Sequence, residues 1–468
     1  MYLIPKKIIK YSNVENVYSL KRAKENQISI LEEDFITAGK DSYFILDFGK
    51  ETSGGIRILT YETHADETKH IRIRFGESVA ETCAELGEKN AANCHSPRDI
   101  TVLLSSYSDL TFGNTGFRFV RIDFLDEGRV TIKNILAEEK ILRKKAVYGY
   151  RGKDAEIAKI FKVAKRTIDL CSAEGYLWDG VKRDRLVWMG DIHPEMLALT
   201  TLYGRLPIIE NSLDFVKMKT PLPNFMNNLS TYSMWWMIIL RDYYKQTGVK
   251  DYLMKQCDYL QGLLKVMDSK ITDAGEVLYD KVFVEWSSCG TEDEILGVKL
   301  LNIYAVNCAK EVLVLLGEDF TLCDQILAKL HRNDFVVTSQ KAVIALKYFA
   351  LGEISSREYE MLIKDNSCGF STFMSYYILS TIAAYDKEKA ISLLKEYYGA
   401  MLKKGATTFW EDFDISWMEN SGTIYALPAK GKKDIHGDYG KYCYQGFRHS
   451  LCHGWSSGII KFIKDYCE

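Results

Sequence analysis

Three non-periodic segments of the chain place carboxylates beside tryptophan. They cover residues 175–191, 283–288 and 405–414. Glycoside hydrolysis needs such groups, because one carboxylic acid must donate a proton to the leaving oxygen while a second, ionised carboxylate activates water or attacks carbon. Apolar neighbours raise the pKa of a carboxyl group and a nearby arginine lowers it, so one site can hold two carboxyl groups in different protonation states. The candidate carboxylates are Asp179, Asp184, Asp191, Glu285 and Glu411, and the tryptophans beside them are Trp188, Trp286 and Trp410.

These carboxylates also have a simpler interpretation, as helix N-caps and surface ion pairs in long loops. Aspartate is among the commonest N-cap residues, so this interpretation accounts well for any one of them. Three tryptophan–carboxylate segments in one helical region are harder to explain in this way. On the residues alone, the two interpretations are equally supported.

The segments lie in a part of the chain whose hydrophobic residues recur with the helical period of 3.6. No proline interrupts it between Pro223 and Pro428, as expected for a long helical region. Helices are predicted near residues 157–171, 193–204, 208–218, 230–247, 251–270, 295–316, 320–332, 339–351, 355–365, 371–385, 387–403 and 450–466. This number fits a closed (α/α)6 barrel of inner and outer helices. An irregular helical bundle fits it as well, whereas the lack of a fixed-period repeat disfavours a solenoid.

The N-terminal part shows short β-type runs between about residues 42 and 152. In residues 70–75 hydrophobic and polar side chains alternate, so that Ile71, Ile73 and Phe75 would face a core. Short strands at even spacing predict an antiparallel β-sandwich of the jelly-roll kind. We therefore expect a β-sandwich domain at residues 1–150 and a helical domain at residues 151–468.

Composition and charge exclude several classes of protein. Of the 468 residues, 47% are hydrophobic and 26% charged, which is typical of globular domains and argues against disordered or fibrous chains. The formal net charge of −2 disfavours a nucleic-acid partner. The longest apolar run, residues 234–240, is far shorter than the roughly 20 residues that span a bilayer, so no membrane partner is expected. The N-terminus lacks the apolar stretch of a signal peptide, and the 11 cysteines include no CxxC pair, so we expect a cytoplasmic protein with reduced thiols.

Two of the three segments resemble motifs of bacterial α-L-rhamnosidases of glycoside hydrolase family 78. In this family an aspartate is followed by an acid five residues on and by another aspartate twelve residues on, and here these positions are Asp179, Asp184 and Asp191. Residues 405–411 are similar to the family string Gly-Ala-Thr-Thr-x-Trp-Glu, and residues 450–453 to Ser-Leu-x-His. Shorter matches in the β-type part extend the resemblance over most of the chain.

The resemblance implies a β-sandwich followed by an (α/α)6 barrel that hydrolyses terminal α-L-rhamnosides with inversion. The general acid would be Asp184, where the family usually has glutamate, and the general base would be Glu411. Inversion leaves room for a water molecule, so the two carboxyl groups should lie roughly 6.5–9.5 Å apart. The predicted substrate-binding residues are Asp179, Arg183, Trp188, Asp191, His193, Glu285, Trp286, Trp410 and His453. We expect no cofactor and no catalytic metal, and a small glycoside as substrate; a homo-oligomer is left open.

The chain departs from the family at the predicted acid, because Asp184 is one methylene shorter than glutamate. A non-catalytic carbohydrate-binding relative is therefore one alternative. Another is an enzyme of the same fold that acts on a different sugar such as a uronide, whose carboxylate would pair with Lys182, Arg183 or Arg185.

Potential metal ligands near the C-terminus raise a third alternative, a structural zinc site. His436, Cys443, His449, Cys452 and His453 fall within 18 residues. Their spacing matches no zinc-binding pattern. We therefore expect these histidines to make hydrogen bonds or to contact the sugar.

Overall fold

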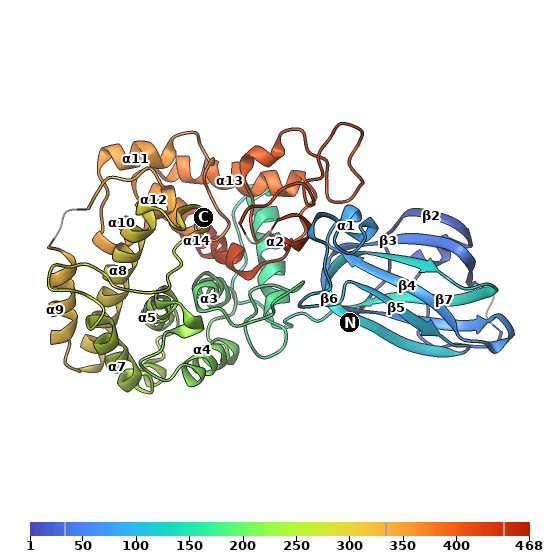
Figure 1. The fold of residues 1–468 in the computed structure, drawn as a ribbon, viewed down its shortest axis with the longest axis horizontal. Helices are drawn as coiled ribbons and strands as arrows, with labels where there is room; N and C mark the ends of the chain where they lie inside the picture. Colours follow the sequence, from blue (N-terminus) through green and yellow to red (C-terminus); the bar gives the residue numbers. More distant parts are fainter. Residues whose placement is uncertain (32–33, 333–334, 443–444) are drawn as a thin grey trace.

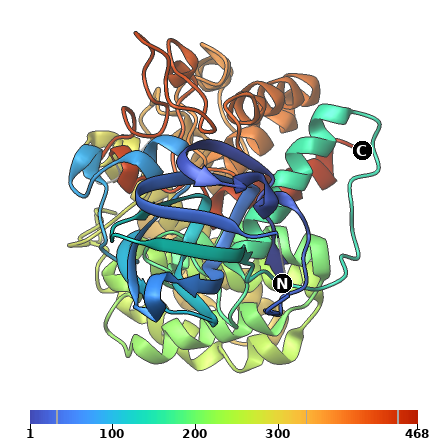
Figure 2. The same cartoon turned by 90° about the vertical axis from the view of Figure 1, so that its right-hand side faces the viewer.

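The structure, a computed structural model, describes residues 1–31, 34–332, 335–442 and 445–468. A region of β-strands and a larger helical region lie side by side (Figure 1), and each has its own hydrophobic core. Viewed from the β end, the strands lie in front of the helices (Figure 2). The last strand ends at Glu138 and the next helix begins at Ala155, so the predicted boundary at residue 150 falls in the connection.

The N-terminal strands form one antiparallel sheet, which confirms the prediction of antiparallel strands. They are β1 (Tyr2–Leu3), β2 (Lys7–Glu15), β3 (Ile36–Thr63), β4 (Lys69–Gly76), β5 (Asp99–Leu104), β6 (Ser108–Phe124) and β7 (Arg129–Glu138). Their order is β1-β7-β3-β6-β4-β5, with β2 on β3. Both ends of the long strand β3 pair with β7, so the sheet curls around its core. Breaks in register along β3 allow this bend.

The helices of the second region agree with most of the predicted segments. The short helix α1 (Val79–Cys83) belongs to the β region; the others are α2 (Ala155–Cys171), α3 (Met189–Tyr203), α4 (Pro207–Lys219), α5 (Ser230–Thr247), α6 (Lys250–Met254), α7 (Cys257–Asp268), α8 (Glu292–Leu316), α9 (Thr321–Leu330), α10 (Lys341–Leu351), α11 (Ser356–Ile363), α12 (Ser375–Tyr385), α13 (Lys387–Lys403) and α14 (Ile459–Tyr466). None of the helices in the described ranges is long and apolar enough to cross a membrane.

The helices are arranged in two layers. In the inner layer α3, α5, α8, α10, α12 and α14 each contact the next, and α14 contacts α3, so that the ring closes. The inner helix α3 is buried along its whole length, as expected for a helix that is surrounded by others. The outer helices α2, α4, α7, α9, α11 and α13 cover this ring, each against an inner neighbour.

Two predicted helices differ from the observed ones. The segment predicted at residues 251–270 is divided into α6 and α7. The helix predicted at residues 450–466 begins only at Ile459, after a short 3-10 helix, Gly454–Gly458. Residues 450–458 are rich in serine and glycine, which favour turns over helix interiors, and this irregular stretch carries residues of the site described below.

Two arginine side chains join the two regions. Arg118 on β6 pairs with Asp47 on β3 and also donates to the Gly405 carbonyl at 3.1 Å. Arg166 on α2 pairs with Glu139 at 2.7 Å. The β region is therefore attached to the segment that follows α13, which is one of the segments rich in carboxylate and tryptophan.

Candidate active site

A cavity of about 320 Å³ opens at the N-terminal ends of α3, α5 and α8. This volume is at the lower end of the range typical of small-ligand sites. The residues that line it are Asp179, Asp184, Trp188, Asp191, Leu229, Tyr232, Val282, Phe283, Trp286, Cys289, Glu411, His453 and Trp455. The three segments that combine carboxylates with tryptophan thus all contribute to one cavity.

Backbone pairing holds the segment between α2 and α3 against the C-terminal part of the chain. The Gly454 amide donates to the Asp179 carbonyl at 2.6 Å, and Gly180 and His453 form an antiparallel bridge. The Leu186 amide donates to Oδ1 of Asp179 at 2.9 Å, which closes the turn. These contacts place Asp179 next to His453.

Glu411 is a buried carboxylate with several positive or hydrogen-bonding partners. Its side chain accepts hydrogen bonds from Nη2 of Arg183 and, at 3.0 Å, from the Ser450 amide. Nδ1 of His453 lies 3.7 Å from Oε1. Burial alone would raise the pKa of Glu411, but the charges of Arg183 and His453 outweigh it and lower this pKa to about 2. Glu411 is therefore ionised at neutral pH, as a general base must be.

Arg183 and His453 each bridge Glu411 to an aspartate. Nη1 of Arg183 donates to Oδ2 of Asp184 at 2.6 Å, while Nη2 donates to Glu411. Because one planar guanidinium binds both carboxylates, their bonded oxygens lie within about 7 Å of each other. This limit admits both inverting and retaining glycosidase pairs. On the other side, Nε2 of His453 lies 3.0 Å from Oδ1 of Asp191.

The aspartates of the cavity differ in their surroundings. Burial raises the pKa of Asp179 to about 8, although the charge of His453 opposes this shift. Burial also raises the pKa of Asp191, against the hydrogen bond and charge of His453. Asp184 is more accessible, with 11% of its side chain exposed, and contacts Arg183. At neutral pH the cavity therefore contains an ionised Glu411 and a protonated Asp179.

Aromatic rings form much of the cavity wall. Trp188 packs edge-on against Tyr232 with ring centroids 6.0 Å apart, and Phe283 against Trp286 at 4.9 Å. Ring faces of this kind can pack on the apolar C–H face of a sugar. Six lining residues are not predicted from the sequence: Leu229, Tyr232, Val282, Phe283, Cys289 and Trp455. Of these residues, Trp455 was the easiest to predict from the sequence, because it lies two residues after the motif that ends at His453.

A small recess continues the cavity beside Glu411. It has a volume of about 10 Å³, enough for one water molecule. Glu285, Ser371 and Asp412 are among the residues that line it, and the Ser371 hydroxyl donates to Oε2 of Glu285 at 2.5 Å. Burial raises the pKa of Glu285 to about 7 and that of Asp412 to about 6. The predicted site residue Glu285 thus lines the recess beside Glu411 and not the main cavity.

The structure corrects the prediction for Trp410, which does not line the cavity. Its ring is fully buried and packs edge-on against Phe413 and His449. Glu411, the next residue, lines the cavity instead. The two residues are adjacent in the motif, yet the structure places the ring of Trp410 in the core and the carboxylate of Glu411 at the cavity.

The prediction for His193 is corrected as well. Its Nδ1 lies 2.5 Å from the Tyr377 hydroxyl and its Nε2 2.9 Å from Asp242, inside the ring of inner helices. Asp191 is two residues earlier on the same helix, and two residues correspond to about 200° of rotation, so both cannot face the cavity. The ring of His193 stacks on Trp235, which is core.

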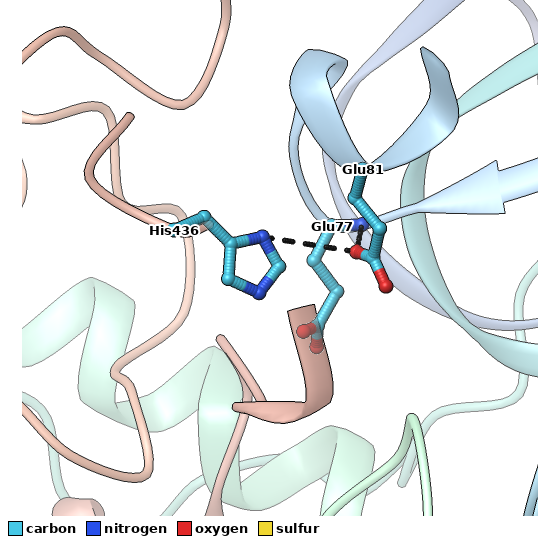
Figure 3. Close-up of side chains that lie close together, drawn as sticks. All are labelled: Glu77, Glu81 and His436. Atoms are coloured by element: carbon cyan, nitrogen blue, oxygen red, sulfur yellow. Dashed lines mark hydrogen bonds and ion pairs between the residues drawn. The ribbon is translucent and has the colours of Figure 1, made fainter. Parts of the chain in front are cut away.

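The predicted zinc alternative finds no support in the structure. Cys443 lies outside the described residues. Within the described ranges the candidate metal-binding group is Glu77, Glu81 and His436, whose potential ligand atoms lie within 4.8 Å of one another (Figure 3). Nζ of Lys182 lies 2.8 Å from Glu81 and 3.4 Å from Glu77, so one ammonium group already pairs with both carboxyl groups. The cluster belongs to the contact between the two regions.

The cationic residues that suggested an acidic substrate are engaged elsewhere. Lys182 binds the Glu77–Glu81 cluster, and Arg183 binds Asp184 and Glu411. Arg185 donates to the Val181 carbonyl and packs over Trp178. Among the described residues that line the main cavity there is no lysine or arginine, whereas Lys441 is among the residues that line the recess beside Glu411.

No protein-family model matches the chain, and no curated protein matches its sequence. Its structure, however, is similar to solved structures. A rhamnosidase from Klebsiella oxytoca with rhamnose bound has a TM-score of 0.76 at 18% identity, over 100% of this chain and 96% of that chain. The chain has an α-L-rhamnosidase-like fold.

Two further structures share this fold. A GH78 family rhamnosidase of Bacillus sp. GL1 has a TM-score of 0.71 at 16% identity, covering 96% of this chain and 48% of that chain. An alpha-L-rhamnosidase from Streptomyces avermitilis complexed with L-rhamnose has a TM-score of 0.64 at 14% identity, covering 90% of this chain and 42% of that chain. The chain thus spans less than half of these two proteins and nearly all of the Klebsiella one.

Proposed function

We propose that the protein is a glycoside hydrolase that removes terminal α-L-rhamnosyl or closely related residues from small glycosides, with inversion. The observation that carries this proposal is the cavity in which an ionised Glu411 and three aspartates meet between aromatic walls. The fold of rhamnosidases with bound rhamnose supports the choice of sugar. The helical region would be the predicted (α/α)6 barrel and the curled sheet the predicted β-sandwich.

In this proposal Glu411 activates the water that attacks the anomeric carbon. Its low pKa keeps it ionised over the physiological pH range, which is the state a general base needs before it accepts a proton. The recess beside it is large enough for the attacking water. Ser371 and Glu285 would hold that water in line with the sugar.

Asp184 would donate the proton to the leaving oxygen. Support comes from its position on the same guanidinium as Glu411 and from its greater access to solvent, which a leaving group needs. Asp179, Asp191 and His453 would bind sugar hydroxyls. Because Asp179 is protonated at neutral pH, it is the alternative proton donor.

The cavity suits a neutral deoxy sugar better than a charged one. Leu229, Val282 and Phe283 make part of its wall apolar, and the methyl group at C6 of rhamnose would pack there. Trp188 and Trp286 would flank the ring.

Kinetics with an aryl α-L-rhamnoside test the proposal. We expect wild-type protein to release the aryl group and Glu411→Gln to lower kcat by about 10²–10⁴-fold, because the general base is lost. Glu419→Gln, at an exposed glutamate outside the cavity, is the matched control and should keep wild-type activity. Binding of rhamnose without turnover would replace the enzyme proposal by that of a carbohydrate-binding protein, and turnover of a uronide alone would replace the substrate.

Substrates with good and poor leaving groups can show whether Asp184 or Asp179 is the proton donor. A variant that lacks the proton donor loses most activity on a poor leaving group and little on a good one, because a good leaving group departs without protonation. We expect Asp184→Asn to show this pattern. Asp179→Asn should slow both substrates alike; the reverse result would assign the acid to Asp179.

A further inference from the structure

The predicted acid also contacts the β region. Nδ1 of His95 lies 2.8 Å from Oδ1 of Asp184, and Arg183 binds the other oxygen, Oδ2. His95 lies between α1 and β5. Each oxygen of the carboxyl group of Asp184 thus has its own partner, one from each region of the molecule.

The loop that carries His95 is fastened on both sides of it. Before it, the side-chain oxygen of Asn93 accepts hydrogen bonds from the amides of Arg98 and Asp99, both at 3.0 Å. After it, the Ser96 hydroxyl donates to the Asn114 carbonyl at 3.0 Å. The guanidinium of Arg98 is buried and donates to main-chain carbonyls around α1. His95 is therefore held in place by its own domain and not only by Asp184.

Backbone strain accompanies this contact. His95 has a φ of 68°, Asp184 a φ of 58° and Arg185 a φ of 55°, all in the left-handed region that non-glycine residues seldom adopt. Such conformations persist only where the surrounding structure imposes them, and they cluster at functional sites. The chain accepts strain on both sides of the His95–Asp184 contact.

His95 is more exposed to solvent than Asp184, which it contacts. Its side chain is 34% exposed, whereas that of Asp184 is 11% exposed. Histidine exchanges protons readily near neutral pH. The charged groups that face Asp184 are Arg183, His95 and, at longer range, Asp179, and of these His95 alone combines direct contact with a ring nitrogen that can release a proton.

We infer that His95 positions Asp184 and returns a proton to it after each turnover, an inference that rests on the proposed function. During the reaction Asp184 gives its proton to the leaving oxygen, and Glu411 takes one from water. The imidazolium of His95 then transfers its Nδ1 proton to Oδ1 of Asp184 and becomes a neutral imidazole, which a hydronium ion or a buffer acid protonates again, while Glu411 releases the proton it took to solvent water. The β region thereby completes the active site.

Variants at His95 test this inference with two substrates of different leaving group. We expect His95→Ala and His95→Asn to lower kcat at least tenfold on phenyl α-L-rhamnoside and less than threefold on the 2,4-dinitrophenyl compound, with KM unchanged. Asparagine keeps a hydrogen-bond donor but cannot deliver a proton, so His95→Asn should be no more active than His95→Ala. Added imidazole should restore activity to His95→Ala and leave wild-type protein unaffected.

The chain offers a matched control in His70, another histidine of the β region. Its Nδ1 lies 2.9 Å from Asp126, and neither residue lines the cavity. His70→Ala should keep kcat within twofold of wild type. Equal losses on both substrates in His95→Ala, or no rescue by imidazole, would overturn the proton return while leaving the proposed function in place.

Nuclear magnetic resonance of ¹⁵N-labelled histidine tests the contact without turnover. Asp184→Asn should shift the imidazole signals of His95 and not those of His70, and Asp126→Asn should do the reverse. An unchanged His95 signal in Asp184→Asn would overturn the inference. If wild-type protein cleaves neither rhamnoside, the proposed function and the proton return are both wrong. The NMR spectra would still show whether His95 contacts Asp184.

Discussion

Glu411 and Asp179 are both buried carboxyl groups of one cavity, yet their pKa values are shifted in opposite directions. Burial raises both, but the cations Arg183 and His453 lie within reach of Glu411 and outweigh it. For Asp179 burial outweighs the charge of His453 and the hydrogen bond from the Leu186 amide, and its pKa rises to about 8. The same network thus supplies an ionised and a protonated carboxyl group at one pH.

The raised pKa of Asp179 predicts a pH-dependent cost to stability. In the unfolded chain aspartate ionises near pH 4, whereas the folded protein keeps the proton up to about pH 8. Between these values folding requires uptake of a proton, so stability falls as pH rises, by at most about 1.4 kcal/mol per pH unit. Asp179→Asn should remove this dependence and be more stable than wild type at pH 8, by a margin that shrinks toward pH 4.

Urea denaturation at pH 5 and at pH 8 measures this margin. Asp273→Asn, at an aspartate that is 92% exposed, serves as the control and should change stability little at either pH. A margin for Asp179→Asn that is the same at both values would mean that Asp179 is already ionised in the folded protein.

Residue types and spacing were sufficient to nominate most of the cavity, including Asp179, Asp184, Asp191 and Glu411. They were insufficient for side-chain direction, which is why Trp410 and His193 were wrongly placed. Tyr232 and Phe283 were missed because an aromatic residue of the core and one of a cavity wall look alike in sequence. His95 could not be found from the helical motifs, since it lies in the other region.

Strand β6 packs directly against the segment that carries the predicted acid. A Cβ atom on Gly116 would lie 2.8 Å from the backbone nitrogen of Lys182 and 2.6 Å from the side chain of Val181. These residues come directly before Arg183 and Asp184. Only glycine lets β6 pack this closely on the segment that carries the predicted acid.

Gly116→Ala should therefore displace residues 181–184. We expect a loss of about 1–3 kcal/mol in the free energy of unfolding from overpacking. We also expect kcat to fall by about 10²-fold, because small displacements of catalytic groups have large effects. Gly149→Ala is the control, since nothing lies within 4 Å of its added Cβ atom. Wild-type activity in Gly116→Ala would show that residues 181–184 can move to accommodate the added methyl group without loss of function.

The period of the hydrophobic residues predicted most helices and the antiparallel strands. It did not predict the start of α14 at Ile459, since the apolar residues of 450–458 are buried by tertiary contacts and not by a helix. Nor could it predict the pairing of both ends of β3 with β7, which depends on contacts between distant residues.

For the whole molecule, the contact between the two regions depends on buried charges. Lys182 is the cation that faces Glu77 and Glu81 across this contact. The pKa of Glu77 is raised to about 7, because its burial outweighs the charge of Lys182. The residue after Lys182 is Arg183, so the same segment joins the β region and orders the active site.

Lys182→Met should destabilise the protein by about 3–5 kcal/mol, because it leaves buried carboxylates without their cation. Lys40→Met removes an exposed partner of Glu127 and should change the free energy of unfolding little, because exposed ion pairs contribute little to stability. Chemical denaturation of both variants measures the difference. Equal effects would mean that the two regions do not depend on this charge cluster for their association.

The first sugar anomer released from an aryl α-L-rhamnoside, followed by proton NMR, tests the central claim most directly. Attack by a water that Glu411 activates, on the face away from the leaving group, predicts that β-L-rhamnose forms first and then mutarotates. Initial release of α-L-rhamnose, or no release of rhamnose at all, would contradict the account.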